Sequence, residues 1–180
     1  MHVNLLKFQD KNKWRQLYEK TKENYWTPET IDVQADKNHW LSMDKALKRK
    51  VMGLLQYAII LDSFQVTNLQ EQGLEQSSDP MLGALLSFHS LMEAVHSQSY
   101  SYWAEAVCTP KQKAWLYQQS EMSENRLRAY EDLRKTDRQL ANYFLEGVSF
   151  QALFRLSDLL KSQGFLPGLS AILTLIKRDE

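Results

Sequence analysis

Residues 91–100, LMEAVHSQSY, lie inside a long apolar pattern of helical period, yet they include an acid, an imidazole and a phenol. Glu93 and His96 are three residues apart and Tyr100 follows four residues later, so a helix places all three side chains on one face. Ionisable side chains are almost never buried without a partner. The stretch therefore predicts a buried helix, and it raises the question of what its polar face holds.

Length and charge limit the classes of protein to consider. The 180 residues suffice for one domain with a substantial core, and the 22 basic residues balance the 22 acidic ones, so nothing predicts binding to nucleic acid or to an anionic membrane. A single cysteine, Cys108, excludes an internal disulfide and fits a reducing compartment. The sequence shows neither a membrane-spanning apolar run nor a signal-peptide pattern, so we expect a cytoplasmic protein without a membrane partner.

Few helix breakers interrupt the chain, which has 6 glycines and 4 prolines. This favours an all-α bundle of long helices. Asp79-Pro80 and Thr109-Pro110 each combine an N-cap residue with proline at the first helical position. We expect residues 1–38 to form an extended N-terminal segment and residues 39–180 to form the bundle. The expected helices cover about 42–72, 80–108, 110–135 and 137–163, and a last one runs from about 167 to the end.

Four of these helices have a carboxylate on an apolar face. Asp62, Glu93, Glu146 and Glu180 each lie on a stripe of aliphatic or aromatic residues at helical spacing, and no Lys or Arg interrupts these stripes. Four carboxylates in one bundle would repel one another and lose hydration, at a cost of several kcal/mol per ion. Two divalent metal ions would neutralise them. Bundle di-metal sites use one carboxylate from each of two helices and Glu-x-x-His from each of two others, which fits Asp62, Glu146 and the EAVH of residues 93–96.

Each of these residues alone also has an ordinary explanation. Glu93 and His96 could be a capped or solvated pair, Asp62 could be a hydrogen-bonded carboxylate near a helix end, and Glu146 could face solvent if the helix phase were shifted by one residue. The four carboxylates in combination, on four helices in this order, are much more specific for a di-metal carboxylate site.

Five segments resemble one family over nearly the whole chain, the small (β) subunit of class I ribonucleotide reductase. YWTPETIDVQAD resembles its Trp-x-Pro-Glu entry segment, ILDSFQ its Leu-Asp-Ser/Thr-x-Gln metal motif, and FLEGVSF and LIKRDE two later motifs. MEAVHSQSYS is close to the form typical of the class Ib branch. The intervals of 31 residues between Asp62 and Glu93, and of 34 residues between Glu146 and Glu180, agree with the family pattern. The resemblance implies a ferritin-like helical bundle.

The resemblance also implies a set of metal ligands. Asp62, Glu93 and His96 would bind one metal ion, and Glu146 and Glu180 would bind mainly a second one. The cofactor would be two iron or two manganese ions.

Further residues match the radical chemistry of the family. Tyr100 falls where the family has its radical tyrosine, and helix geometry agrees, because Tyr102 points nearly opposite to the face of Glu93 and His96. Trp26 and Asp179 match the start of the electron path, although Trp26 could equally anchor the N-terminal segment. The apolar pocket around the radical would consist of Phe150, Phe154 and Ile176.

The function implied by the resemblance is that of the radical-generating small subunit of ribonucleoside-diphosphate reductase, an oxidoreductase. Its radical would support the reduction of ribonucleotides to deoxyribonucleotides in a separate catalytic large (α) subunit. We expect a homodimer, with the helices at 42–72 and 80–108 as candidates for the interface. A class Ib identity would add a flavodoxin-like activator as a partner.

The sequence departs from the family pattern at its end. Glu180 should begin a second Glu-x-x-His, so we expect the chain to be truncated at the C-terminus and inactive by itself. His89 lies one turn before Glu93 and is expected to be a core histidine, or one that supports a ligand, rather than a ligand itself. Two other functions stay open: another ferritin-like di-metal oxidase or oxygenase with an open pocket near Tyr100, and a metal-free bundle that acts as a partner protein.

Overall fold

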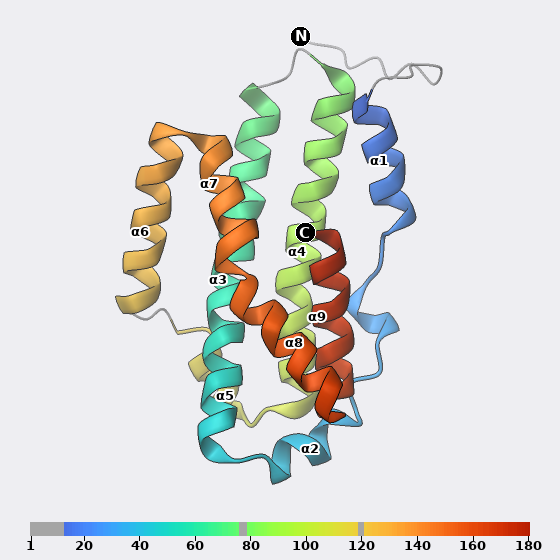
Figure 1. Ribbon diagram of the computed structural model, residues 1–180, viewed down its shortest axis with the longest axis vertical. Coiled ribbons are helices and arrows are strands. Elements are labelled where there is room, and N and C mark those ends of the chain that lie inside the picture. Colours follow the sequence, from blue (N-terminus) through green and yellow to red (C-terminus); the bar gives the residue numbers. More distant parts are fainter. Residues whose placement is uncertain (1–12, 76–78, 119–120) are drawn as a thin grey trace.

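The computed structural model describes residues 13–75, 79–118 and 121–180, and within these ranges every regular element is a helix (Figure 1). The all-α prediction is therefore confirmed. The elements in chain order are α1 (Lys13–Glu23), η1 (Pro28–Thr30), α2 (Asp36–Ser42), α3 (Lys45–Glu75), α4 (Pro80–Val107), α5 (Pro110–Leu116), α6 (Glu121–Thr136), α7 (Arg138–Phe144), η2 (Leu145–Ser149), α8 (Gln151–Gln163) and α9 (Pro167–Asp179). In the part of the chain that is described, no helix is long and apolar enough to cross a membrane.

The two longest helices, α3 and α4, form the centre of the bundle and run antiparallel side by side (Figure 1). The helices α8 and α9 pack against each other and against this central pair, and α1 lies along the outer side of α4. The short helices α2 and α5 lie together at one end of the bundle, where α3 begins (Figure 1). This arrangement brings the middles of α3 and α4 close to the end of α9.

Local capping signals explain where two long segments begin. One carboxylate oxygen of Asp79 accepts hydrogen bonds from the backbone N–H groups of Met81 and Leu82, at 2.9 and 3.4 Å, and proline occupies the first position of α4. Thr109 and Gln112 form a reciprocal capping box at the start of α5. Both predicted helix starts are therefore confirmed, because a cap depends only on residues within one turn.

The prediction of one continuous helix over 110–135 is wrong in the middle of that range. The chain forms α5 and α6 as separate helices, with α5 ending at Leu116 and α6 beginning at Glu121. The side-chain amide of Gln56, on α3, donates to the backbone carbonyls of Trp115 and Gln118 at 2.8 and 2.6 Å. This tertiary contact satisfies carbonyl groups that a helix end leaves open.

The expectation of an extended segment over residues 1–38 is also wrong where the structure describes it; residues 1–12 lie outside the described part. Residues Lys13–Glu23 form α1, which is rich in strong helix formers. Its Tyr18 ring packs edge-on against Phe88 of α4, with ring centroids 6.0 Å apart. The expected boundary at residue 38 falls inside α2, so α1 and α2 are packed parts of the bundle. Among residues 13–38, only the linker between α1 and α2 runs without helix, apart from the single turn of η1.

A buried carboxylate fixes the start of α9. Asp36, which is fully buried on α2, accepts hydrogen bonds at 2.8 Å from the indole N–H of Trp103 and from the backbone N–H groups of Gly168 and Leu169. These two backbone groups belong to the first turn of α9, which has no helical acceptor for them. Asp36 thereby holds the position of the helix whose far end presents Asp179 and Glu180.

Candidate metal centre

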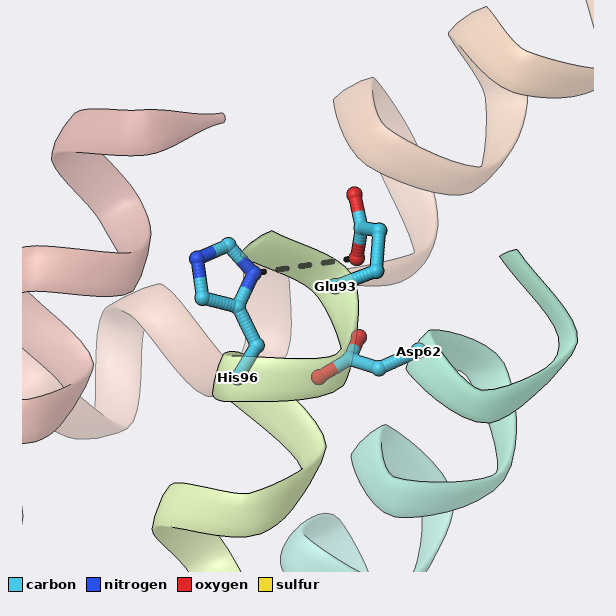
Figure 2. Close-up of side chains that lie close together, drawn as sticks. All are labelled: Asp62, Glu93 and His96. Carbon is cyan, nitrogen blue, oxygen red and sulfur yellow. Dashed lines mark ion pairs between the residues drawn. The ribbon is translucent and has the colours of Figure 1, made fainter. Parts of the chain in front are cut away.

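The five predicted metal ligands converge at the middle of the bundle. Asp62 of α3 and Glu93 and His96 of α4 each offer a ligand atom, and these atoms all lie within 4.8 Å of one another. Figure 2 shows the three side chains pointing toward a common point. Glu93, Glu146 and Glu180 form a second group, whose ligand atoms also all lie within 4.8 Å of one another. Because Glu93 belongs to both groups, the two candidate metal positions are adjacent.

A local distortion of the helix positions Glu146. Residues Leu145–Ser149 form a π-helical turn between α7 and α8, so the helix predicted over 137–163 is not uniform. A π-helical turn adds one residue to the helical repeat and is frequent at functional sites. Beyond this turn Phe150, Leu153 and Phe154 are buried, as the apolar stripe predicted.

The side chains of this centre are buried without the hydrogen bonds that buried polar atoms need. Asp62, Glu93 and His96 are exposed by 0, 6 and 2 %, and the side chain of Glu180 by 6 %, although the residue as a whole is exposed. Among the described residues, both oxygens of Asp62, Oε2 of Glu93 and Nδ1 of His96 have no hydrogen-bond partner. Buried polar atoms are otherwise almost always paired. Carboxylates with an imidazole are typical ligands of iron and manganese, so the residues fit a di-metal cofactor.

Burial and mutual repulsion raise the pKa values of the carboxyl groups. Burial, and then the charge of Glu180, raises the pKa of Glu93 to about 7 and that of Glu146 to about 8. Burial and the charge of Glu93 raise the pKa of Asp62 well above its usual range. Without a compensating cation, protons would reduce the charge of this site at neutral pH, and a bound metal ion would displace them.

His96 connects the carboxylates to the outer side of the site. Its Nδ1 lies 3.7 Å from Oε2 of Glu93 and 3.4 Å from Oε1 of Glu180, and its Nε2 lies 3.3 Å from Oδ2 of Asp179. Burial lowers the pKa of His96, but the neighbouring carboxylates of Asp179, Glu180 and Glu93 together outweigh burial and raise it well above its usual value. The Nδ1 atom is thus the one that faces the candidate metal positions.

Trp26 and Asp179 extend this contact away from the centre. The indole N–H of Trp26 donates to Oδ2 of Asp179 at 2.6 Å, and the same oxygen faces His96. The rings of Trp26 and His96 also stack, with centroids 6.1 Å and planes 25° apart. Burial would raise the pKa of Asp179, but hydrogen bonds from His96, Trp26 and Arg178 hold it below its usual value. Asp179 is therefore an anion that bridges the two rings.

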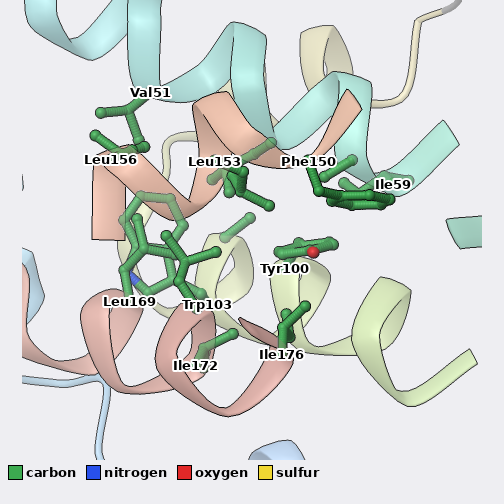
Figure 3. Packing of buried hydrophobic residues seen from close by; sticks show 14 of the residues in the cluster. Val51, Ile59, Tyr100, Trp103, Phe150, Leu153, Leu156, Leu169, Ile172 and Ile176 are labelled. Atoms are coloured by element: carbon green, nitrogen blue, oxygen red, sulfur yellow. The ribbon is translucent and has the colours of Figure 1, made fainter. Parts of the chain in front are cut away.

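Tyr100 lies one turn beyond His96 and is fully buried. Figure 3 shows its ring between Phe150 and Ile176, which are exposed by 1 and 0 %. Phe154 is also buried and stacks on Phe150, with ring centroids 6.0 Å apart. Burial, and then the charge of Asp62, raises the pKa of Tyr100 well above its usual value. Tyr102 instead donates to the backbone carbonyl of Ile31 at 3.4 Å, on the N-terminal segment.

A cavity of about 320 Å³ adjoins the centre. Its lining includes Glu93, Glu146 and Glu180 on one side and residues of α1, such as Lys20, on the other. His89 also lines this cavity and is exposed, so it is not a core histidine; the other expectation, that it supports a ligand, stays a prediction. The three carboxylates therefore border an open space beside α1.

Sequence reasoning did not single out a set of buried and half-buried polar residues behind Glu146, although one of them, Gln65, is the last residue of the ILDSFQ motif. The set consists of Gln65, Asn68 and Gln72 of α3, Tyr130 and Arg134 of α6 and Asn142 of α7. A signal for it exists in the sequence, because Asp62, Gln65 and Asn68 recur every three residues along a buried helix. That polar line distinguishes this face of α3 from an apolar core stripe.

Comparison with known proteins identifies the family. The family model described as ribonucleotide reductase, small chain, matches residues 2–180. The ribonucleoside-diphosphate reductase subunit beta of Treponema pallidum is 28 % identical over 98 % of this chain and 53 % of its own length. The human subunit M2 of the same enzyme is 27 % identical over 92 % of this chain and 45 % of its own length. The chain thus spans about half the length of the curated relatives it matches.

Solved structures share the fold. A dimanganese(II)-NrdF of Streptococcus sanguinis superimposes with a TM-score of 0.90 at 18 % identity, over 99 % of this chain and 66 % of its own. An R2-like ligand-binding oxidase with a Mn/Fe cofactor superimposes with a TM-score of 0.72 at 21 % identity, over 99 % of this chain and 73 % of its own. These likenesses show the fold, and the match of the family model to residues 2–180 shows that the chain belongs to the ribonucleotide reductase small chain family.

Proposed function

We propose that this chain acts as the radical-generating small subunit of a ribonucleoside-diphosphate reductase. Its partner would be a separate catalytic large (α) subunit, which reduces ribonucleotides to deoxyribonucleotides. The observation that supports this function best is the convergence of four carboxylates and one imidazole near a buried tyrosine, Tyr100, whose pKa three of the carboxylates raise.

The residues would hold two metal ions in two adjacent positions. Asp62, Glu93 and His96 would bind one ion, and Glu146 and Glu180 would bind the other, with Glu93 close enough to contact both. Two iron or two manganese ions bound there would supply the oxidising equivalent, after reaction with dioxygen or an equivalent oxidant. The four carboxylates would balance the positive charge of the ions, and the unpaired oxygens of Asp62 make it the strongest candidate ligand on α3.

Tyr100 would store the oxidising equivalent. Because burial and the charge of Asp62 raise its pKa, the phenol would give up its electron only together with its proton. Among the charged neighbours of the phenol, Asp62 acts on it most strongly, so Asp62 would be the group of this chain that influences the loss of the proton. Phe150, Phe154 and Ile176 would keep water and reductants away from the resulting neutral radical.

The radical would leave the site along His96, Asp179 and Trp26. The hydrogen bond of 2.6 Å from Trp26 to Asp179 and the stacking of Trp26 on His96 support this route, since they join the candidate ligand to a large aromatic ring by direct contact. Asp179 would remain an anion and would hold both rings in orientation.

Further properties follow from the same proposal. The subunit would be a cytoplasmic homodimer, with outward faces of α3 and α4 as candidates for the interface, and a class Ib member would use a flavodoxin-like activator. A mass measurement at micromolar concentration tests the dimer, and a strictly monomeric mass would contradict it.

The proposal is tested by electron paramagnetic resonance on metal-loaded, oxidised protein. We expect a tyrosyl radical signal that Tyr100→Phe abolishes while the metal content stays the same. Tyr102→Phe is the matched control and should leave the signal intact, because Tyr102 points to Ile31. A signal that persists in Tyr100→Phe would assign the radical elsewhere. The alternative of a di-metal oxidase would prefer an open pocket near Tyr100, and the full burial of Tyr100 favours the radical function instead.

A further inference from the structure

Glu146 is the candidate ligand that has a buried hydrogen-bond donor behind it. The side-chain amide of Gln65, fully buried on α3, donates to Oε1 of Glu146 at 2.8 Å. Gln65 is in turn surrounded by side chains that keep it in place. Its Oε1 accepts from the amide of Asn68 at 3.0 Å and from the hydroxyl of Tyr130 at 3.4 Å.

The hydrogen bonds of this group form a line from the protein surface to Glu146. Arg134, on α6, lies at the outer end, where its guanidinium contacts the half-exposed carboxylate of Glu71 at 2.7 Å. The same nitrogen of Arg134 donates to Oδ1 of Asn68 at 3.5 Å. Asn68 then donates to Gln65, and Gln65 donates to Glu146.

The direction of this line is determined at its outer end. An amide side chain can present either its oxygen or its NH₂ group to a neighbour, whereas a guanidinium can only donate and stays charged. Arg134 therefore requires the oxygen of Asn68, which turns the NH₂ group of Asn68 toward Gln65. Gln65 must then present its own oxygen outward and its NH₂ group to Glu146. Tyr130 has a single hydroxyl proton, which faces two oxygens, Oδ1 of Asn142 at 3.0 Å and Oε1 of Gln65 at 3.4 Å, and this placement also favours the oxygen of Gln65 on that side.

We propose that Gln65 is a positioning residue for Glu146, and that Arg134 sets, through Asn68, the direction of the hydrogen bond that Gln65 donates. The inference rests on the proposed function, because it assumes that Glu146 binds a metal ion. The donor holds one oxygen of Glu146 and so keeps the carboxylate turned toward Glu93 and Glu180. If the amide of Gln65 were reversed, two oxygens would face each other and Glu146 would turn away.

The test measures metal affinity. Mn²⁺ is titrated into the purified protein, and the free ion is followed by its electron paramagnetic resonance signal. Co²⁺ is used in parallel, because its visible absorption reports the geometry of its ligands. Glu146→Gln first identifies the binding event that depends on Glu146. We then expect Gln65→Met to weaken that event by about tenfold or more and to change its Co²⁺ spectrum, while the other event stays within about threefold.

Gln56→Met is the matched control. Gln56 is also a buried glutamine of α3 whose amide makes two hydrogen bonds, but its partners are the backbone carbonyls of Trp115 and Gln118. Its loss should lower the melting temperature without changing either affinity for metal. Arg134→Met leaves Gln65 in place but removes the donor to Asn68, together with the ion pair to Glu71 at the surface, so it should weaken the same event as Gln65→Met, by a smaller factor.

Each outcome decides one part of the inference. An unchanged affinity in Gln65→Met, with the event lost in Glu146→Gln, would overturn the role of Gln65 and leave the metal centre standing. An equal loss of affinity in Gln56→Met would assign the effect to general packing and would also overturn it. If Gln65→Met does not fold, as judged by circular dichroism, Arg134→Met decides, and unchanged affinity there refutes the inference. A wild-type protein that binds no metal ion would overturn the proposed function itself.

Discussion

Metal binding should release protons, because two carboxyl groups of the centre are partly protonated at neutral pH. The pKa of Glu93 is raised to about 7 and that of Glu146 to about 8, by burial and then by the charge of Glu180. At pH 7 the first group is about half protonated and the second about nine-tenths protonated. Since a divalent metal ion binds the carboxylate form, these two groups alone should release about 1.4 protons per chain.

The pH dependence of this release is a sharper test than its size. At pH 9 the same two groups hold only about 0.1 proton between them, so the release should fall by more than one proton between pH 7 and pH 9. Asp62 and His96, whose pKa values are both raised, add to the release at pH 7. The total measured at pH 7 should therefore exceed the contribution of Glu93 and Glu146.

Titration calorimetry with Mn²⁺, in buffers that differ in their enthalpy of ionisation, measures the protons released per ion bound. Glu146→Gln removes one of the two groups and should reduce the release per chain at pH 7 by at least about 0.9 proton. A release below about half a proton at pH 7, or one that does not decline toward pH 9, would show that the carboxylates are already ionised without metal. The reasoning from burial and mutual repulsion would then be wrong.

The same shifts predict how the metal-free protein responds to pH. Glu93 and Glu146 have pKa values above the ordinary value of 4.5, so between about pH 4.5 and pH 8 the folded state binds more protons than the unfolded state. The free energy of unfolding should therefore fall as the pH rises through this window, because the folded state must hold these two carboxyl groups as buried charges at high pH. His96, with a raised pKa, acts in the same direction. Thermal melts of metal-free protein should give a higher Tm at pH 5.5 than at pH 8.5, and Mn²⁺ should reduce the difference.

Three further predictions concern single side chains. Asp62→Ala should lower the amount of iron or manganese bound per chain, as measured by elemental analysis, and normal loading would remove Asp62 from the ligands. Gly168→Ala should lower the free energy of unfolding in urea by about 1 to 3 kcal/mol, because the added Cβ would lie 2.8 Å from the backbone of Asp32. Gly83→Ala is the control: a Cβ there meets nothing within 4 Å, so this variant should be more stable by up to about 1 kcal/mol. Asp36→Asn should cost about 2 to 4 kcal/mol, since an amide cannot accept all three of its hydrogen bonds, and a variant as stable as wild type would show that α9 is held by packing alone.

Much of the fold could be predicted because its signals are local. The starts of α4 and α5 depend on side chains within one turn, so the capping residues Asp79 and Thr109 are enough to predict them. The breaks could not be predicted in this way. The end of α5 is stabilised by Gln56, more than fifty residues earlier in the chain, and α1 is held by contacts such as that of Tyr18 with Phe88. Such contacts depend on how helices pack, which no local pattern contains.

The sequence by itself determined which residues can meet on each helix of this protein. A period of 3.6 residues places Glu93, His96 and Tyr100 on one face and turns Tyr102 away, whatever the rest of the chain does. Only the tertiary structure decided that Asp62, Glu93, Glu146 and Glu180 come within one another's reach, because this requires α3, α4, η2 and α9 to pack in one arrangement. The same holds for the line of hydrogen bonds behind Glu146, where the donor that faces the carboxylate is set by an arginine on another helix.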